Sequence, residues 1–175
     1  MIPPLSHVSG NSLSAVLANF SIGSVFWTGN AVATVITTQN TWTRVAPVAG
    51  TLATPTVNFD RPANARLRYT LIAAGNLIIA ATYSISSAAP NDVYLIGIWK
   101  NGTVNANNEF TGGAQVAGST VRLKAGGAGD VQSSSVVCVD VAALNDFYEL
   151  AVQNTLSTAD PTFSDANLFG SGRSA

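Results

Sequence analysis

The sequence predicts an all-β protein that folds as an antiparallel sandwich or barrel. From residue 34 onward, short segments of alternating character recur, and stretches rich in Gly, Pro, Asn and Asp separate them. Alternation is typical of strands, because successive side chains of a strand point to opposite faces. The even spacing of these segments, and the lack of helices between them, favour antiparallel pairing over a parallel sheet.

We expect eight or nine strands, taken from residues 34–45, 56–59, 67–72, 77–86, 92–100, 115–124, 132–141, 147–153 and 162–169. The sharpest turn signal is Asn101-Gly102, because both central positions of a type I′ hairpin turn need positive φ. Both faces of the strand at 92–100 are largely apolar. We therefore expect a second sheet to cover one face and another element to cover the other.

Residues 1–33 differ from the rest of the chain and predict a short N-terminal arm before a domain at 34–175. Leu13, Val16, Leu17 and Phe20 recur at the spacing of one helical face. A helix this short is marginal alone, so it must dock on a surface. Whether that surface belongs to its own domain or to a neighbouring subunit stays open at this point.

Composition excludes several functions. Charged residues make up 10% of the chain, its formal net charge is -1, and Lys100 and Lys124 are its lysines. Nucleic-acid binding needs a basic surface, which this chain lacks. The apolar runs are far shorter than the roughly 20 residues that span a bilayer. Cys138 has no intrachain partner for a disulfide, and no basic leader precedes an apolar run, so we expect synthesis in a cytoplasm.

The order of the expected strands resembles the jelly roll of the tumour-necrosis-factor and complement-globular-head family. The segment NLIIAATYSIS (76–86) is similar to the second-strand motif of that family, and NDVYLIGIWKNGTV (91–104) is similar to the family's next strand and hairpin. The pair of strands joined by a Leu-x-x-Gly-Asp corner is similar to SSVVCVDVAALNDFYELAVQN (134–154). The closing strand resembles FSDANLFGSG (163–172). Asn145-Asp146 replaces the usual Gly-Asp, a change that a turn tolerates.

This resemblance covers residues 34–172 and implies an antiparallel jelly-roll β-sandwich with a short N-terminal arm. This chain is a small version of that fold, rich in Ser, Thr and Ala and with a short N-terminal arm. In these features it is similar to bacteriophage head decoration (cement) proteins and to the knobs of head or tail fibres. The resemblance implies a homotrimer in which one sheet of each subunit faces the threefold axis.

The residues themselves also indicate a partner. One face of the strand at 77–86 is strongly apolar, and the other is small and uncharged, with Ile78, Ala80, Thr82 and Ser84. Several such faces left in water would exceed the apolar patch that soluble monomers usually expose. We take Tyr83, Tyr148 and Leu150 as residues of the trimer interface.

A basic cluster, Arg61, Arg66 and Arg68, allows two interpretations. It can form a salt-bridged surface strand with Asp60, or it can contact an acidic neighbouring subunit. Trp27, Trp42 and Trp99 are expected in core or interface packing, with a sugar-stacking platform as the alternative.

We predict no catalytic, cofactor-binding or metal site. His7 is the single histidine, so a triad or a histidine metal site would have to recruit distant partners. Cys138 lies among valines and is expected to be a buried, inert thiol. The aspartates lack the spacing of a calcium-binding loop.

These observations favour a non-enzymatic virion protein, assembled in a host cytoplasm. It would be a trimeric decoration or cement protein whose arm binds the major capsid protein or another virion protein. The alternative is the tip of a fibre that binds a host glycan or surface protein through loops such as residues 103–118. We expect neither nucleic-acid nor membrane binding.

Overall fold

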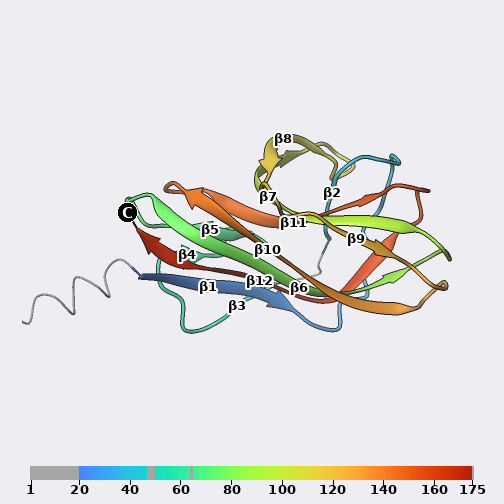
Figure 1. The fold of residues 1–175 in the computed structure, drawn as a ribbon, viewed down its shortest axis with the longest axis horizontal. Coiled ribbons are helices and arrows are strands. Elements are labelled where there is room, and N and C mark those ends of the chain that lie inside the picture. Colours follow the sequence, from blue (N-terminus) through green and yellow to red (C-terminus); the bar gives the residue numbers. More distant parts are fainter. Residues whose placement is uncertain (1–19, 47–49, 64, 175) are drawn as a thin grey trace, which may run out of the picture.

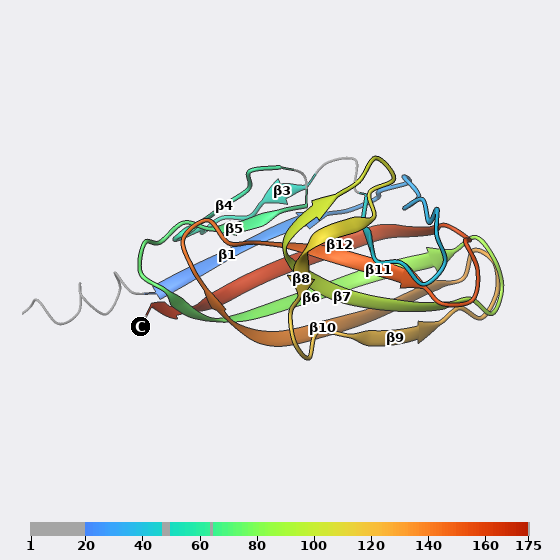
Figure 2. The same cartoon turned by 90° about the horizontal axis from the view of Figure 1, so that it is seen from above.

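The computed structural model describes residues 20–46, 50–63 and 65–174, and this part of the chain is built from strands without a helix. The strands form two sheets packed face to face (Figures 1 and 2). No helix that could cross a membrane occurs within these residues. The prediction of an all-β antiparallel sandwich is confirmed.

Sheet A has the strand order β10-β6-β12-β1-β3. Its members are β10 (Val131–Ala142), β6 (Gly75–Ser87), β12 (Pro161–Ser174), β1 (Phe20–Trp27) and β3 (Thr51–Leu52). All of their pairings are antiparallel.

Sheet B has the order β4-β5-β11-β7-β8, with β2 paired to β11 and β9 paired to β7. Its members are β4 (Phe59–Asp60), β5 (Leu67–Tyr69), β11 (Phe147–Asn154), β7 (Val93–Val104), β8 (Phe110–Gln115), β2 (Thr43–Arg44) and β9 (Val121–Lys124). The chain alternates between sheets from β6 to β7 and from β10 through β11 to β12. Neighbouring strands of sheet A are therefore distant in sequence.

The core lies between the inner faces of the two sheets. On β6 it takes the alternate residues Leu77, Ile79, Ala81, Tyr83 and Ile85, which are all buried as the sequence pattern predicts. From sheet B it takes Tyr94, Ile96, Ile98, Tyr148, Leu150 and Val152. Because each strand gives every second side chain to this core, the remaining side chains face outward.

The predicted end of the arm at residue 33 is wrong. Residues 20–27 form β1, which pairs with β12 from Phe20 opposite Arg173 to Trp27 opposite Ala166. Val25 and Trp27 are buried and Phe26 is exposed, so this segment follows the two-residue period of a strand. Phe20 therefore belongs to the sandwich and not to a helix, whereas Leu13, Val16, Leu17 and His7 lie outside the described residues.

The predicted strand at 34–45 is also wrong over most of its length. Only Thr43–Arg44 forms a strand, and the residues before it cross the end of the sandwich with isolated contacts. Ile36 is inserted into the core, and its backbone N–H donates to Asp160 Oδ1 over 2.8 Å. Side chains and loop residues therefore provide hydrogen-bond partners for the backbone of this segment, in place of a neighbouring strand.

The turn predicted at Asn101-Gly102 does not occur there. β7 continues to Val104, with Asn101 at a φ of 54° where the register with β8 shifts. A side chain at Gly102 would overlap the ring of Phe110. The Asn-Gly pair therefore forms an irregularity inside a long strand, and the chain reverses instead at residues 105–108, where Asn108 N donates to Asn105 O.

Candidate functional site

An uncharged apolar surface on the outer face of sheet A is the candidate site. The side chains of Val137, Val139 and Val141 on β10 are 59, 70 and 60% exposed, and that of Ile78 on β6 is 50% exposed. Strand register places Val139 opposite Ile78, Ile78 opposite Ser171 and Ser171 opposite Ile22. The four adjacent strands β10, β6, β12 and β1 therefore present one continuous row of apolar and small groups.

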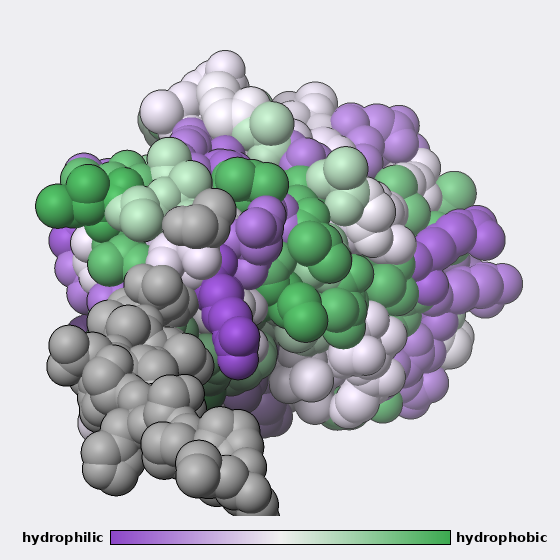
Figure 3. Space-filling view, turned by 60° about the vertical axis from the view of Figure 1, so that its left-hand side comes forward, coloured by the Kyte–Doolittle hydropathy of each residue, from purple (hydrophilic) through white to green (hydrophobic). Residues whose placement is uncertain are grey.

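The next row along the same strands has the same character. It joins Val137, Ala80, Phe169 and Ser24. Charge enters in the rows beyond these two: Arg173 stands opposite Asn76 in the row that also holds Val141, and Asp165 lies toward the other end of this face. Figure 3, turned toward the end that carries the C-terminus, shows a hydrophobic patch at the centre of the surface. We call the exposed residues Ile78, Val137, Val139 and Val141, with Ile22 and Phe169, the valine face.

The outer face of sheet B is closed by the chain itself. Trp42 covers Gly97, the Trp42 and Trp99 rings lie 5.8 Å apart, and the Trp99 and Phe110 rings stack at 4.6 Å. Trp99 Nε1 also donates to Gly112 O over 3.0 Å. The predicted double covering of the strand at 92–100 is confirmed, and residues of the same chain provide the outer cover.

A buried ion pair lies beside these rings. Glu149 is fully buried, and its Oε1 accepts from Arg66 Nε over 2.8 Å, with Arg44 Nη1 at 3.7 Å. The Arg66 guanidinium also lies 4.5 Å from the centre of the Phe147 ring. Burial raises the pKa of Glu149, and Arg66 and Arg44 offset only part of this rise.

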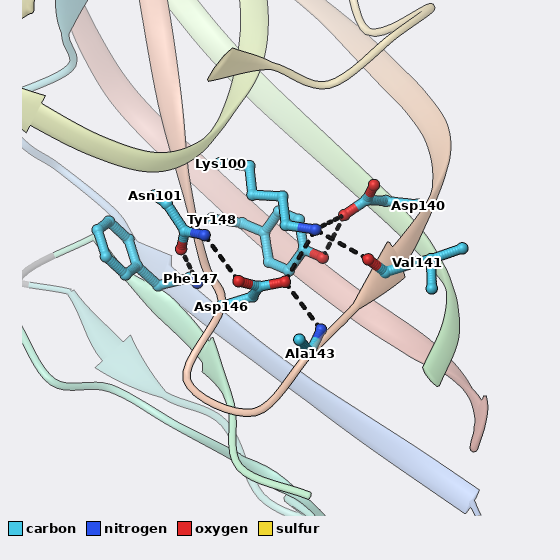
Figure 4. Close-up of polar contacts among 8 residues, drawn as sticks. All are labelled: Lys100, Asn101, Asp140, Val141, Ala143, Asp146, Phe147 and Tyr148. Carbon is cyan, nitrogen blue, oxygen red and sulfur yellow. Dashed lines mark hydrogen bonds and ion pairs between the residues drawn. The ribbon is translucent and has the colours of Figure 1, made fainter. Parts of the chain in front are cut away.

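A second ionic cluster joins the two sheets at the end of β10 (Figure 4). Lys100 Nζ on β7 lies 2.8 Å from both Asp140 Oδ2 and Asp146 Oδ2, and it donates to Val141 O. Tyr148 donates its hydroxyl to Asp140 over 2.6 Å. Each charged group has its partners inside the cluster, so we assign it a structural role.

The pKa values of this cluster follow from those contacts. Burial lowers the pKa of Lys100, but the two carboxylates outweigh it and the net shift is upward. Burial raises the pKa of Asp146, but hydrogen bonds from the Ala143 N–H, Asn101 and Lys100 produce a net decrease. Both groups are thus held in their charged forms.

The residues predicted for the trimer interface are not at a surface. Tyr83, Tyr148 and Leu150 are 3, 0 and 1% exposed in the single chain. They belong to the inward-facing alternate set, so their assignment to an interface is wrong. The outward-facing residues of β10 are the exposed ones instead. The run VVCVDV (136–141), which has valine on both faces of the strand, is the sequence signal for them.

The predicted basic cluster is divided by the fold. Arg68 pairs with Asp60, with Nε donating to Oδ1 over 2.8 Å, as the surface-strand interpretation predicts. Arg66 turns to Glu149. Arg61 is exposed, and a contact between this cluster and an acidic neighbour remains a prediction.

The described residues contain no group of three His, Cys, Asp or Glu side chains that could hold a metal ion. Cys138 is buried, and burial raises the pKa of its thiol to about 11. Trp27 packs in the core and donates its indole N–H to Phe163 O.

Comparison with known proteins identifies the fold. No family model matches the sequence, and no curated protein matches it. Among solved structures, the Eiger tumour necrosis factor from S. frugiperda superposes with a TM-score of 0.52 at 11% identity, over 90% of this chain and 94% of that one. The chain has a tumour-necrosis-factor-like jelly-roll fold. The resemblance drawn from its strand motifs is confirmed at the level of the fold.

Two further structures align over most of their length. PRD1 vertex protein P5 aligns with a TM-score of 0.46 at 9% identity, over 89% of this chain and 97% of that one. Murine APRIL aligns with a TM-score of 0.42 at 11% identity, over 87% of this chain and 98% of that one.

Proposed function

We propose that this chain is the subunit of a homotrimeric, non-enzymatic structural protein of a virion, in which the valine face forms the contact between subunits. The observation that carries the proposal is the absence of charge across the two central rows of sheet A, where the exposed branched side chains of Ile78, Val137 and Val139 stand together. Water is a poor environment for such a face, and each Å² of apolar surface removed from it contributes roughly 25 cal/mol. A second copy of the chain supplies a matching uncharged surface.

The direction of attachment follows from the strand ends. The first residues of β1 pair with the last residues of β12, near the marked C-terminus in Figure 1. The N-terminal arm therefore joins the sandwich at this end. We propose that the arm, with Leu13, Val16 and Leu17, binds the major capsid protein or another virion protein, as the sequence resemblance to decoration proteins implies.

A charge in the valine face tests the trimer. We expect light scattering to give the wild type a mass of three times the 18.0 kDa chain. The Val139→Asp variant should have the mass of one folded chain, because each copy would bury an unpaired carboxylate in the contact. Leu156→Asp is the control, since Leu156 is 58% exposed but lies outside sheet A. A wild-type mass of one chain would refute the trimer.

Deletion of residues 1–19 tests the arm. This deletion leaves β1 intact, whereas removal of residues 1–33 would take a strand out of sheet A. The shortened protein should stay trimeric by light scattering and no longer co-sediment with particles. Unchanged co-sedimentation would exclude an anchoring role for the arm.

The second candidate is a fibre tip that binds a host ligand. A groove in sheet A favours this candidate. The groove lies at the end where Trp27 pairs with Ala166, away from the end where Phe20 pairs with Arg173. Electron microscopy of intact particles separates the candidates, because a decoration protein covers the head lattice and a fibre tip does not.

A further inference from the structure

A groove crosses the outer face of sheet A beyond the valine face. Its volume is about 670 Å³, and four strands line it. β10 and β6 contribute Ser133, Ser135 and Thr82, β12 contributes Asp165 and Asn167, and β1 contributes Phe26. It therefore belongs to the same face as the proposed subunit contact but has a different chemical character.

Strand register explains why this part of the sheet is hollow and polar. Ser135 stands opposite Thr82, Thr82 opposite Asn167 and Asn167 opposite Phe26, so one row holds two hydroxyls, an amide and a phenyl ring. All four residues are exposed. Two rows away, the corresponding row holds Val139 and Ile78. Short side chains leave space above the strands, and Phe26 provides an apolar side to that space.

The charge in the groove is a fixed carboxylate. Asp165 Oδ1 accepts from Gly29 N over 3.2 Å and Oδ2 accepts from Ser164 Oγ over 2.9 Å, at a point where the register of β12 with β6 shifts. Among the described residues, no lysine or arginine lines the groove. An anionic ligand would meet this carboxylate without a compensating cation.

We propose that this groove binds a neutral oligosaccharide. A sugar offers several hydroxyls that both donate and accept, which suits the hydroxyl, amide and carboxylate groups of the floor. A pyranose ring also has an apolar face that packs on an aromatic ring, the role given to Phe26. Asp165 selects against phosphorylated and acidic sugars.

This inference deepens the proposed function and depends on it for one point, the direction in which the groove faces. The arm joins the sandwich at the Phe20 end of β1, and Phe26 lies near the opposite end of that strand. If the arm holds the particle, the groove points away from it. A saccharide at a host surface could then reach the groove.

Saturation-transfer NMR on the full chain tests the site. The probes are neutral trisaccharides of glucose, galactose, mannose and N-acetylglucosamine, with trigalacturonate as the acidic probe. We expect transfer to at least one neutral probe and none to trigalacturonate. Asn167→Ala should weaken binding of that probe at least about tenfold, since it removes a hydrogen bond to the ligand. Asp165→Asn should weaken it as well, because a neutral amide replaces a charged acceptor. Ser135→Trp should abolish binding by filling the groove.

Thr111→Ala is the matched control, because Thr111 is an exposed hydroxyl residue on β8 of sheet B and should leave binding unchanged. No transfer to any neutral probe, stronger transfer to trigalacturonate, or full binding by the Ser135→Trp variant would each overturn the inference. Light scattering on the same samples separates the two proposals. A trimer that binds no sugar refutes only the groove, and a monomer that binds sugar refutes only the trimer.

Discussion

The outer faces of the two sheets are built on opposite principles. β11 in sheet B is buried on both sides through most of its length, whereas β10 in sheet A alternates between core and solvent. The cover over β11 and β7 comes from the same chain, through Trp42, Trp99, Phe110 and Arg66. The valine face has no such cover within the described residues. One face therefore completes the fold, and the other is the surface that we propose for the contact between subunits.

The largest expected effect lies on the closed face. Arg66→Met leaves the buried carboxylate of Glu149 with only the distant Arg44, so we expect a loss of about 3–5 kcal/mol in the free energy of unfolding at neutral pH. Urea denaturation measures it. The loss should shrink toward pH 4.5, the ordinary pKa of the group, because burial raises the pKa of Glu149 and its proton then removes the uncompensated charge.

Arg68→Met is the control for this change. The Arg68 and Asp60 side chains are 34 and 40% exposed, so the same substitution should cost about 1 kcal/mol or less. Equal losses of unfolding free energy in the two variants would contradict the view that the ion pair of Arg66 with Glu149 is buried and excluded from water.

A matched pair of isoleucines compares the core with the valine face directly. Both substitutions are made in the Val139→Asp background, so that assembly does not contribute. Ile98→Ala should cost about 2–5 kcal/mol, because Ile98 is fully buried, and Ile78→Ala about 1 kcal/mol or less. If both substitutions lower the free energy of unfolding equally in that background, Ile78 is packed within its own chain. The valine face would then not be an uncovered surface.

The Lys100 cluster should give stability a defined pH window. The pKa of Asp146 is lowered, so its contribution is present above pH 3.8 and is lost as the pH falls through the folded value. The pKa of Lys100 is raised, so its contribution is present below pH 10.5 and is lost as the pH rises through the folded value.

The Lys100→Met variant checks this window. We expect it to lose about 1–3 kcal/mol at neutral pH and to show a flatter pH dependence at both extremes in chemical denaturation. Wild-type and variant curves of the same shape would show that the cluster does not set the window.

The smallest expected effect is a change in the rate at which a thiol reagent labels Cys138. Cys138 lies on the inner face of β10, its pKa is raised to about 11, and it donates to Ile79 O. Iodoacetamide should therefore label it slowly, through opening of this edge strand. The Val139→Asp variant should be labelled faster than the wild type, because no partner covers β10. Equal rates would indicate that the valine face is uncovered in the wild type as well.

Much of the fold could be predicted because the long strands alternate clearly. The segments at 77–86, 132–141 and 147–153 match β6, β10 and β11 within a few residues. β1 was missed because residues 13–20 fit a helical face and hid the two-residue period that begins at Phe20. The cover of β7 could be expected, but its source could not, because Trp42 is 55 positions from Gly97.

The candidate site was harder to predict than the fold. The exposed apolar face that we propose as the subunit contact could be inferred in part from the uncharged outward set of β6, in particular Ile78. The large aromatic and aliphatic residues predicted at the contact, Tyr83 among them, are instead core residues. Residue size alone does not distinguish an interface from a core, and only the strand register shows which valines share a face. The groove depends on four strands lying side by side, which no local pattern reveals.

The pairing of the first and last strands makes this sandwich a natural candidate for circular permutation. A short linker from Ser174 to Phe20 would join ends that the sheet already holds together. New ends could then be opened at the turn of residues 105–108, which lies between two strands and not within one. Such a rearranged chain would keep every backbone ladder while moving its free ends to a different site on the surface.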